Sequence, residues 1–129
     1  MKANELMIGD YVIRKNIPQE ILVVDAIDSI RNIVYLDLDG LGITEKLENI
    51  EPIPLTQKIL EKNGFYHEYN VGYVMEEYEN EIIYNLWDCK LRILKNREQI
   101  LKLKYFDEMC VHELQHVLRL CGINKEIKL

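Results

Sequence analysis

Apolar and polar residues alternate over the first fifty positions in short runs that predict β-strands. Each run is rich in Val, Ile or Tyr, and turn-forming residues such as Gly9–Asp10, Asp28–Ser29 and Gly40 separate it from the next. The predicted strands are 10–14, 21–27, 32–38 and 43–50. Because consecutive strands with short links pair antiparallel, we expect them to form a small antiparallel barrel of the SH3-like kind.

Residues 51–65, EPIPLTQKILEKNGF, interrupt the strand pattern and predict a short helix. Pro52 and Pro54 favour extended backbone, and Thr56 can cap the N-terminus of a helix that runs through Lys62. Gly64 can then end the helix in the left-handed conformation. We expect residues 56–64 to link the barrel to the second half of the chain.

Residues 65–104 return to strand-like runs, which predict a second antiparallel sheet. The runs are FYHEYN, GYVMEEY, EIIYNLW, KLRIL and ILKLKYF. Turn-forming residues between them place the expected turns near Asn70, Asn80, Asp88 and Asn96.

A second helix is predicted from Glu108 to Cys121, with Asp107 as its N-cap and Gly122 as its end. The last five residues, KEIKL, resemble a short strand. The whole pattern predicts one α+β domain over 1–129. Its parts are a barrel-like region (1–55), the linking helix (56–64) and a sheet with one packed C-terminal helix (65–129).

Composition narrows the possible classes of function. The chain has 129 residues, is 48% hydrophobic and carries a net charge of −6, which argues against general nucleic-acid binding because phosphate neutralisation needs a basic surface. No apolar run approaches the roughly 20 residues that span a bilayer, and the start does not resemble a secretory signal. Three widely spaced cysteines, Cys89, Cys110 and Cys121, are typical of a reduced, cytoplasmic protein.

The stretch CVHELQHVL (110–118) contains a His-Glu-x-x-His pattern. On a helix this spacing brings His112 and His116 together as zinc ligands, with Glu113 beside them as a general base. A helical projection puts Leu114 at the centre of an apolar face and both histidines on the opposite face. The local geometry therefore permits a zinc-dependent hydrolase.

The rest of the sequence disfavours that hydrolase. Catalytic zinc needs three protein ligands and an open position, and few residues follow His116. The third-ligand candidates are Glu126, His67 and Asp107, and Arg119 would repel a cation from the histidine face. We therefore expect a solvent-facing helix with no bound cofactor, and keep the zinc hydrolase as the alternative.

The segment KLRILKNREQILKLK (90–104) is a second candidate site, because it is strongly basic. If it forms a hairpin that turns near Asn96, alternation puts Lys90, Arg92, Lys102 and Lys104 on one face of the sheet. Four cations there could bind a phosphate or a nucleotide, and nearby tyrosines could stack on a base.

Two ordinary interpretations compete with this binding site. The basic face can be a solvated surface neutralised by the acidic segment MEEYENE (75–81), since opposite charges commonly pair across strands. The tyrosines between Tyr66 and Tyr84 can be half-buried sheet surface, although Tyr is also enriched where partners dock.

Three segments carry a resemblance to a known family: KANELMIGDYV, IEPIPLTQKILEKNGF and VHELQHVLRLCGINKEIKL. They resemble a family of short, uncharacterised proteins of gut anaerobic bacteria and their phages and mobile elements. His112, Leu114 and Gln115 match the family pattern, whereas Gln and Asn often occupy the positions of Glu113 and His116. The resemblance therefore implies that the zinc motif is accidental, and it implies no activity or catalytic residue.

These observations predict a non-enzymatic, cytoplasmic accessory protein of a phage or mobile element that acts by binding. Its partner would be a protein or a small anionic ligand. The basic hairpin and the exposed tyrosines are the first places to look for the binding surface.

Overall fold

The computed structural model describes residues 1–104 and 108–129, with Lys104 through its backbone alone. The chain divides into two compact units, Met1–Ile53 (unit 1) and Pro54–Leu129 (unit 2), close to the expected end of the barrel-like region at residue 55. Each unit contains one five-stranded antiparallel sheet, and unit 2 also contains both α-helices. The predicted α+β class with two antiparallel sheets is confirmed.

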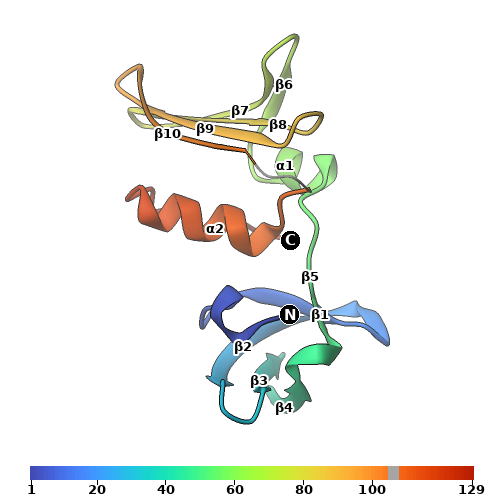
Figure 1. The fold of residues 1–129 in the computed structure, drawn as a ribbon. Coiled ribbons are helices and arrows are strands. Elements are labelled where there is room, and N and C mark those ends of the chain that lie inside the picture. Colours follow the sequence, from blue (N-terminus) through green and yellow to red (C-terminus); the bar gives the residue numbers. More distant parts are fainter. Residues whose placement is uncertain (105–107) are drawn as a thin grey trace. The chain divides into compact units, whose positions relative to one another are not determined.

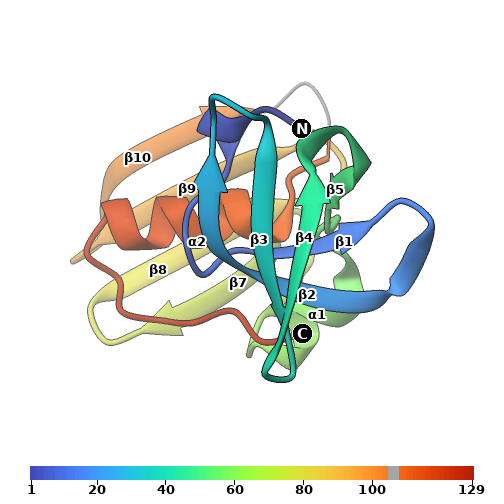
Figure 2. The same ribbon diagram turned by 90° about the horizontal axis from the view of Figure 1, so that it is seen from below.

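Unit 1 is a meander in which a fifth strand returns to pair with the first (Figure 2). The strand order is β4-β3-β2-β1-β5, and the long strand β2 carries a bulge where it pairs with β3. The elements are η1 (Ala3–Glu5), β1 (Tyr11–Arg14), β2 (Ile17–Asp28), β3 (Ile33–Leu38), β4 (Leu41–Lys46), η2 (Leu47–Asn49) and β5 (Ile50–Pro52). No pairing among the described residues joins β4 to β5, so hydrogen bonds do not close a barrel.

The core of unit 1 gathers one face of every strand into a single cluster. Its buried members come from β1, β2, β3, η2 and β5, and Ile43 of β4 packs against them. The fully buried residues include Val12, Leu22, Val24 and Val34. A sheet whose outer strands share one cluster must curve, because a flat sheet would hold them too far apart.

Unit 2 contains the second meander, with strand order β10-β9-β8-β7-β6. The strands are β6 (Tyr66–Glu68), β7 (Gly72–Glu77), β8 (Asn80–Asn85), β9 (Lys90–Lys95) and β10 (Glu98–Lys104). Helix α2 (Val111–Leu120) lies along one face of this sheet (Figure 1). Alternation turns Tyr84, Ile82, Leu91 and Ile93 to one face, and all four are fully buried.

Helix α1 (Gln57–Lys62) forms as its sequence predicts. The hydroxyl of Thr56 accepts a hydrogen bond from the Ile59 amide at 3.3 Å. At the other end, the amides of Gly64 and Phe65 donate to the carbonyls of Glu61 and Leu60, which is the Schellman arrangement. The predicted cap and stop of this helix are confirmed.

Helix α2 begins at Val111, three residues later than the expected start at Glu108. The Met109 amide donates to the Tyr84 hydroxyl at 3.2 Å, and the Met109 carbonyl accepts from the Leu55 amide at 2.9 Å. These bonds keep the chain extended up to Cys110, which is the N-cap in place of the expected Asp107. Asp107 itself lies outside the described residues. Neither α-helix of the described chain is long and apolar enough to cross a membrane.

The C-terminal segment is held by two buried side-chain amides, not by a sheet. Gln115 donates to the Lys125 carbonyl at 2.9 Å and accepts from the Ile127 amide at 2.8 Å. Asn63 makes the same pair of bonds with the backbone of Lys128, both at 2.7 Å. The backbone of this segment therefore bonds to side-chain amides and not to a strand. The prediction of a strand over 125–129 is wrong.

We expect Gln115→Met to lower the free energy of unfolding by about 2 kcal/mol or more. The substitution keeps the length of the side chain but leaves a buried carbonyl and a buried amide without partners, each costing about 1–3 kcal/mol. Urea unfolding measures the loss, and the Ile127 amide should exchange its hydrogen faster.

Gln57→Met is the matched control, because the Gln57 side chain bonds to Glu61 at an exposed position. Its effect should stay within about 0.5 kcal/mol. Equal losses in the two variants would contradict the role of Gln115.

Candidate functional site

The two histidines of the His-Glu-x-x-His pattern lie side by side on α2. Their ring centroids are 5.5 Å apart in an edge-to-face arrangement, so the predicted adjacency is confirmed. The expectation that they face solvent is wrong for His112, which is only 6% exposed, while His116 is half-buried. Gln115, one turn from His112, bonds to the returning C-terminal segment, which lies where the helical pattern predicted water.

Glu113 caps its own helix. Its carboxylate accepts a hydrogen bond from the Cys110 amide at 2.9 Å, the side-chain half of a capping box. This bond satisfies one of the amides that every helix start leaves without a partner. The bond gives Glu113 a structural role at the start of α2.

The two described candidates for a third zinc ligand, Glu126 and His67, make contacts with other residues. Glu126 lies 3.5 Å from Arg119 in an exposed ion pair, and His67 lies on β6 with its ring against Tyr73. Asp107 lies outside the described residues. Across 1–104 and 108–129, no three His, Cys, Asp or Glu side chains are grouped as a metal site.

Burial disfavours the thiolate form of two of the three cysteines. All three are free thiols, as expected. Burial raises the pKa of Cys110 to about 12, with a further contribution from the neighbouring Glu113 carboxylate. Burial also raises the pKa of Cys121. Since the thiolate is the reactive form, these two residues act as packing side chains.

Three of the four predicted cations, Lys90, Arg92 and Lys102, lie on the face of the sheet opposite to Tyr84 and Leu91, and the side chain of Lys104 lies outside the part that the structure describes. The ladder pairs Arg92 with Lys102 and Lys90 with Lys104 across β9 and β10. Lys90, Arg92 and Lys102 line a hollow of about 280 Å³, which we call the basic hollow. Its other lining residues are Asn70, Val71, Ile83, Asn85 and Asp88.

Within this hollow the cations are only partly neutralised. Lys90 lies 3.7 Å from the Asp88 carboxylate. No ion pair between described residues involves Arg92 or Lys102. The acidic segment expected to neutralise them forms no ion pair with them in the described part of the chain. Glu76, Glu79 and Glu81 line a different hollow together with Arg97, although Glu81 lies diagonally across from Arg92 on the same face.

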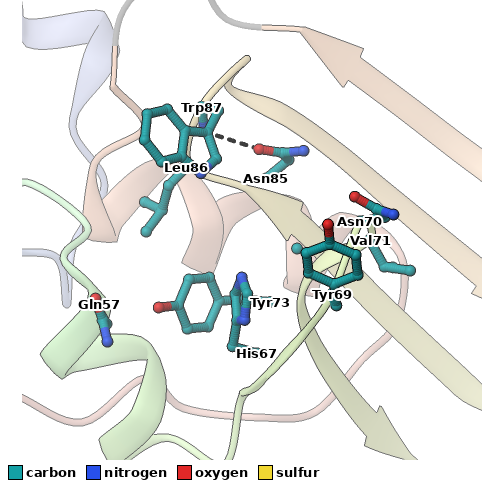
Figure 3. A pocket seen from close by; sticks show the side chains of 10 residues that line it. Gln57, His67, Tyr69, Asn70, Val71, Tyr73, Asn85, Leu86 and Trp87 are labelled. Carbon is teal, nitrogen blue, oxygen red and sulfur yellow. Dashed lines mark hydrogen bonds between the residues drawn. The ribbon is translucent and has the colours of Figure 1, made fainter.

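A larger hollow of about 840 Å³ lies at the same end of the sheet, and we call it the aromatic hollow (Figure 3). It is bounded by the β6–β7 turn, the β8–β9 turn and the first residue of α1. Its lining residues are Gln57, His67, Tyr69, Asn70, Val71, Gly72, Tyr73, Asn85, Leu86 and Trp87. The volume falls in the range of about 300–1,000 Å³ that is usual for ligand pockets.

One hydrogen bond and one ring contact order parts of the aromatic hollow. The Asn85 side chain accepts from the backbone amide of Trp87 at 2.9 Å, which holds the β8–β9 turn (Figure 3). The rings of His67 and Tyr73 brace each other edge-to-face at 5.3 Å. Trp87 and Tyr69 are 94% and 84% exposed, so two large ring faces border the hollow from its two turns.

Gly72 allows the strands below the hollow to come together. Its φ of +119° is disfavoured for residues with a side chain, and a Cβ at this position would lie 2.8 Å from the Tyr84 carbonyl oxygen. The absence of a side chain therefore lets the start of β7 lie directly against the end of β8. This approach brings Asn70 and Val71 beside Asn85.

The two hollows share a wall made of Asn70, Val71 and Asn85, which line both. By strand alternation Tyr73 and His67 lie on the face of the sheet that carries Tyr84, whereas Arg92 and Lys102 lie on the opposite face, so the two hollows meet around the end of the sheet. Sequence patterns indicated the basic surface, but they did not indicate Trp87, and they indicated His67 only as a possible zinc ligand. The segment NLWDC could have indicated Trp87. A turn flanked by Asn85 and Asp88 is an unusual place for a large apolar ring.

We expect Glu113→Ala to lower the free energy of unfolding by about 1 kcal/mol, because it removes the cap of α2. Glu113→Gln should retain most of the stability, since Gln also serves in capping boxes. Thermal unfolding compares the two variants. Metal analysis of the purified protein is the companion measurement, and stoichiometric zinc that is lost in His112→Ala would contradict the capping role as the reason for the motif.

We expect Gly72→Ala to cost about 2 kcal/mol or more, because it combines a strained φ with a backbone clash. Gly64→Ala separates the two effects: its φ is +88°, but no atom lies within 4 Å of the added Cβ. That variant should cost only about 1 kcal/mol. Denaturant unfolding of both variants measures the difference, and a smaller loss at Gly72 than at Gly64 would argue against the close approach.

Comparisons of the chain with protein families, with curated proteins and with solved structures found no match. The chemistry that the two hollows can support is therefore inferred from the side chains that line them.

Proposed function

We propose that this chain is a binding protein that takes a small anionic ligand on the basic hollow of unit 2. One observation supports the proposal above all: Arg92 and Lys102 face each other across β9 and β10 with no ion-pair partner among the described residues. Lys90 and the amide side chains of Asn70 and Asn85 border the same space.

Electrostatic repulsion between Arg92 and Lys102 supports the proposal. Like charges placed opposite each other on a sheet destabilise it, so a pair of cations in this position needs a compensating reason. A phosphate or carboxylate group bound between them would remove the repulsion. The Arg92 guanidinium offers two parallel donors that suit phosphate, and Lys102 adds a mobile positive charge.

The basic hollow combines cations with neutral polar groups. The β6–β7 turn and helix α1 lie at the same end of unit 2. Asn70 and Asn85 can donate and accept hydrogen bonds without adding charge. The only carboxylate in the lining, Asp88, is already paired with Lys90. An anion entering the hollow therefore meets little repulsion.

The wider setting rests on the resemblance of the three sequence segments alone. On that basis the protein is a non-enzymatic accessory protein of a phage or mobile element, acting in the cytoplasm by binding. The capping role of Glu113 and the packing role of Cys110 are compatible with an absence of catalysis.

For unit 1 the proposed architecture is a small SH3-like barrel. Its support is the strand order, the 3₁₀ turn η2 directly before β5, and a core that includes both Ile43 of β4 and Ile50 of β5. Methyl–methyl nuclear Overhauser effects between Ile43 and Ile50 test it, and a solution structure with a flat, open sheet would reject it.

We expect the double variant Arg92→Gln/Lys102→Gln to lose affinity for phosphate-bearing ligands by roughly 100-fold or more, since charge-assisted hydrogen bonds contribute about 1.5–3 kcal/mol each. Thermal shift with inorganic phosphate, pyrophosphate and tripolyphosphate identifies a ligand, and calorimetry then measures the affinities. A saturating ligand should raise the midpoint by a few degrees in the natural sequence.

Lys58→Gln/Lys95→Gln is the matched control, because it removes the same charge from exposed positions outside the basic hollow. It should bind nearly as well as the natural sequence. A midpoint that no phosphate compound moves, or equal losses in the two double variants, would reject the proposed site.

A further inference from the structure

We infer that the ligand is a nucleotide, with its flat ring in the aromatic hollow and its phosphates on the basic hollow. This inference rests on the proposed function and deepens it, because it adds a second binding surface and names the class of ligand. The juxtaposition that carries it is the shared wall of Asn70, Val71 and Asn85.

The aromatic hollow has the chemistry that recognises a base. Trp87 and Tyr69 present exposed ring faces from two different turns, and His67 adds a third ring (Figure 3). Exposing large rings to water is unfavourable, so they gain free energy when a flat, polarisable partner stacks on them. Stacking tolerates any base, because every base has a π face.

Polar groups in the same hollow can bind the edge of such a ring. Asn85 uses its carbonyl oxygen to accept from the Trp87 amide, and no described residue accepts from its side-chain nitrogen. The side chains of Gln57 and Asn70 supply further donors and acceptors. A few convergent polar groups among apolar ones are typical of a small-molecule site.

The distribution of charge over the two hollows disfavours purely apolar ligands and simple anions. No acidic residue lines the aromatic hollow, and the cations stand beyond the shared wall. A purely apolar ligand would leave the cations unused, and a simple anion would leave the rings unused. A ring joined to a flexible chain of phosphates can use both surfaces, with the chain passing around the end of the sheet at Asn70, Val71 and Asn85.

The test uses the full chain and its single tryptophan, Trp87, as the reporter. Fluorescence titrations compare ATP, GTP, CTP and UTP with tripolyphosphate, which lacks the ring, and with adenosine, which lacks the phosphates. We expect at least one nucleoside triphosphate to quench Trp87 and to bind about tenfold or more tightly than either fragment.

Tyr69→Ala isolates the ring site, since it lies in an exposed turn and leaves the reporter in place. It should weaken the nucleotide about tenfold and leave tripolyphosphate unchanged. Tyr78→Ala is the control, because Tyr78 is an equally exposed tyrosine in the β7–β8 turn, away from both hollows. Its affinities should match those of the natural sequence.

The outcomes separate this inference from the proposed function. If tripolyphosphate binds as tightly as every nucleotide and Tyr69→Ala has no effect, the nucleotide inference is overturned and the anion site stands. If adenosine alone binds as tightly as ATP, the two-surface ligand is overturned. If no probe binds, both ideas fail. A short oligonucleotide that binds more tightly than any mononucleotide would also overturn the assignment to a small ligand.

Discussion

The register of the β8–β9–β10 ladder determines which side chains meet at the candidate site. It places Ile83, Arg92 and Lys102 in one row across three strands, and Tyr84, Leu91 and Leu103 in the next. A shift of one residue would exchange the faces, burying cations and exposing the core. Two features fix this register: the fully buried face that carries Tyr84, Leu91 and Ile93, and a two-residue turn at Asn96–Arg97 with positive φ at both residues.

The same ladder explains why local patterns predicted some features and not others. The faces of the basic hairpin follow from alternation alone, and the ends of α1 follow from Thr56 and Gly64, so the sequence suffices for both. The start of α2 depends on bonds from Met109 to Tyr84 and Leu55, which are remote along the chain. No local pattern predicts these remote bonds. For the same reason, no local pattern predicts that the C-terminal segment bonds to Gln115.

The aromatic hollow was harder still to predict, because it depends on the meeting of two turns. Trp87 and Tyr69 are separated by two strands in the sequence, and the antiparallel pairing of β7 with β8 brings their turns together, with a close approach at Gly72. From the sequence alone, Gly72 does not indicate which strand approaches it. The tyrosines between 66 and 84 also divide: Tyr84 is fully buried, with burial raising its pKa to about 12, while Tyr69 lies in water. Their clustering in sequence indicated a surface without indicating which of them formed it.

The acidic character of the chain is compatible with an anion site when the charges are considered by position. The net charge is −6, yet the cations Lys90, Arg92 and Lys102 adjoin one another, while Glu76, Glu79 and Glu81 gather at another hollow of the same unit. Charges act over about 8 Å at physiological salt, so a small ligand in the basic hollow meets mainly its cations. A nucleic-acid strand that continued along the sheet would reach the carboxylates and be repelled. For the proposed nucleotide site, the expected selection is by the size of the anion, because only a longer strand would extend from the basic hollow to those carboxylates.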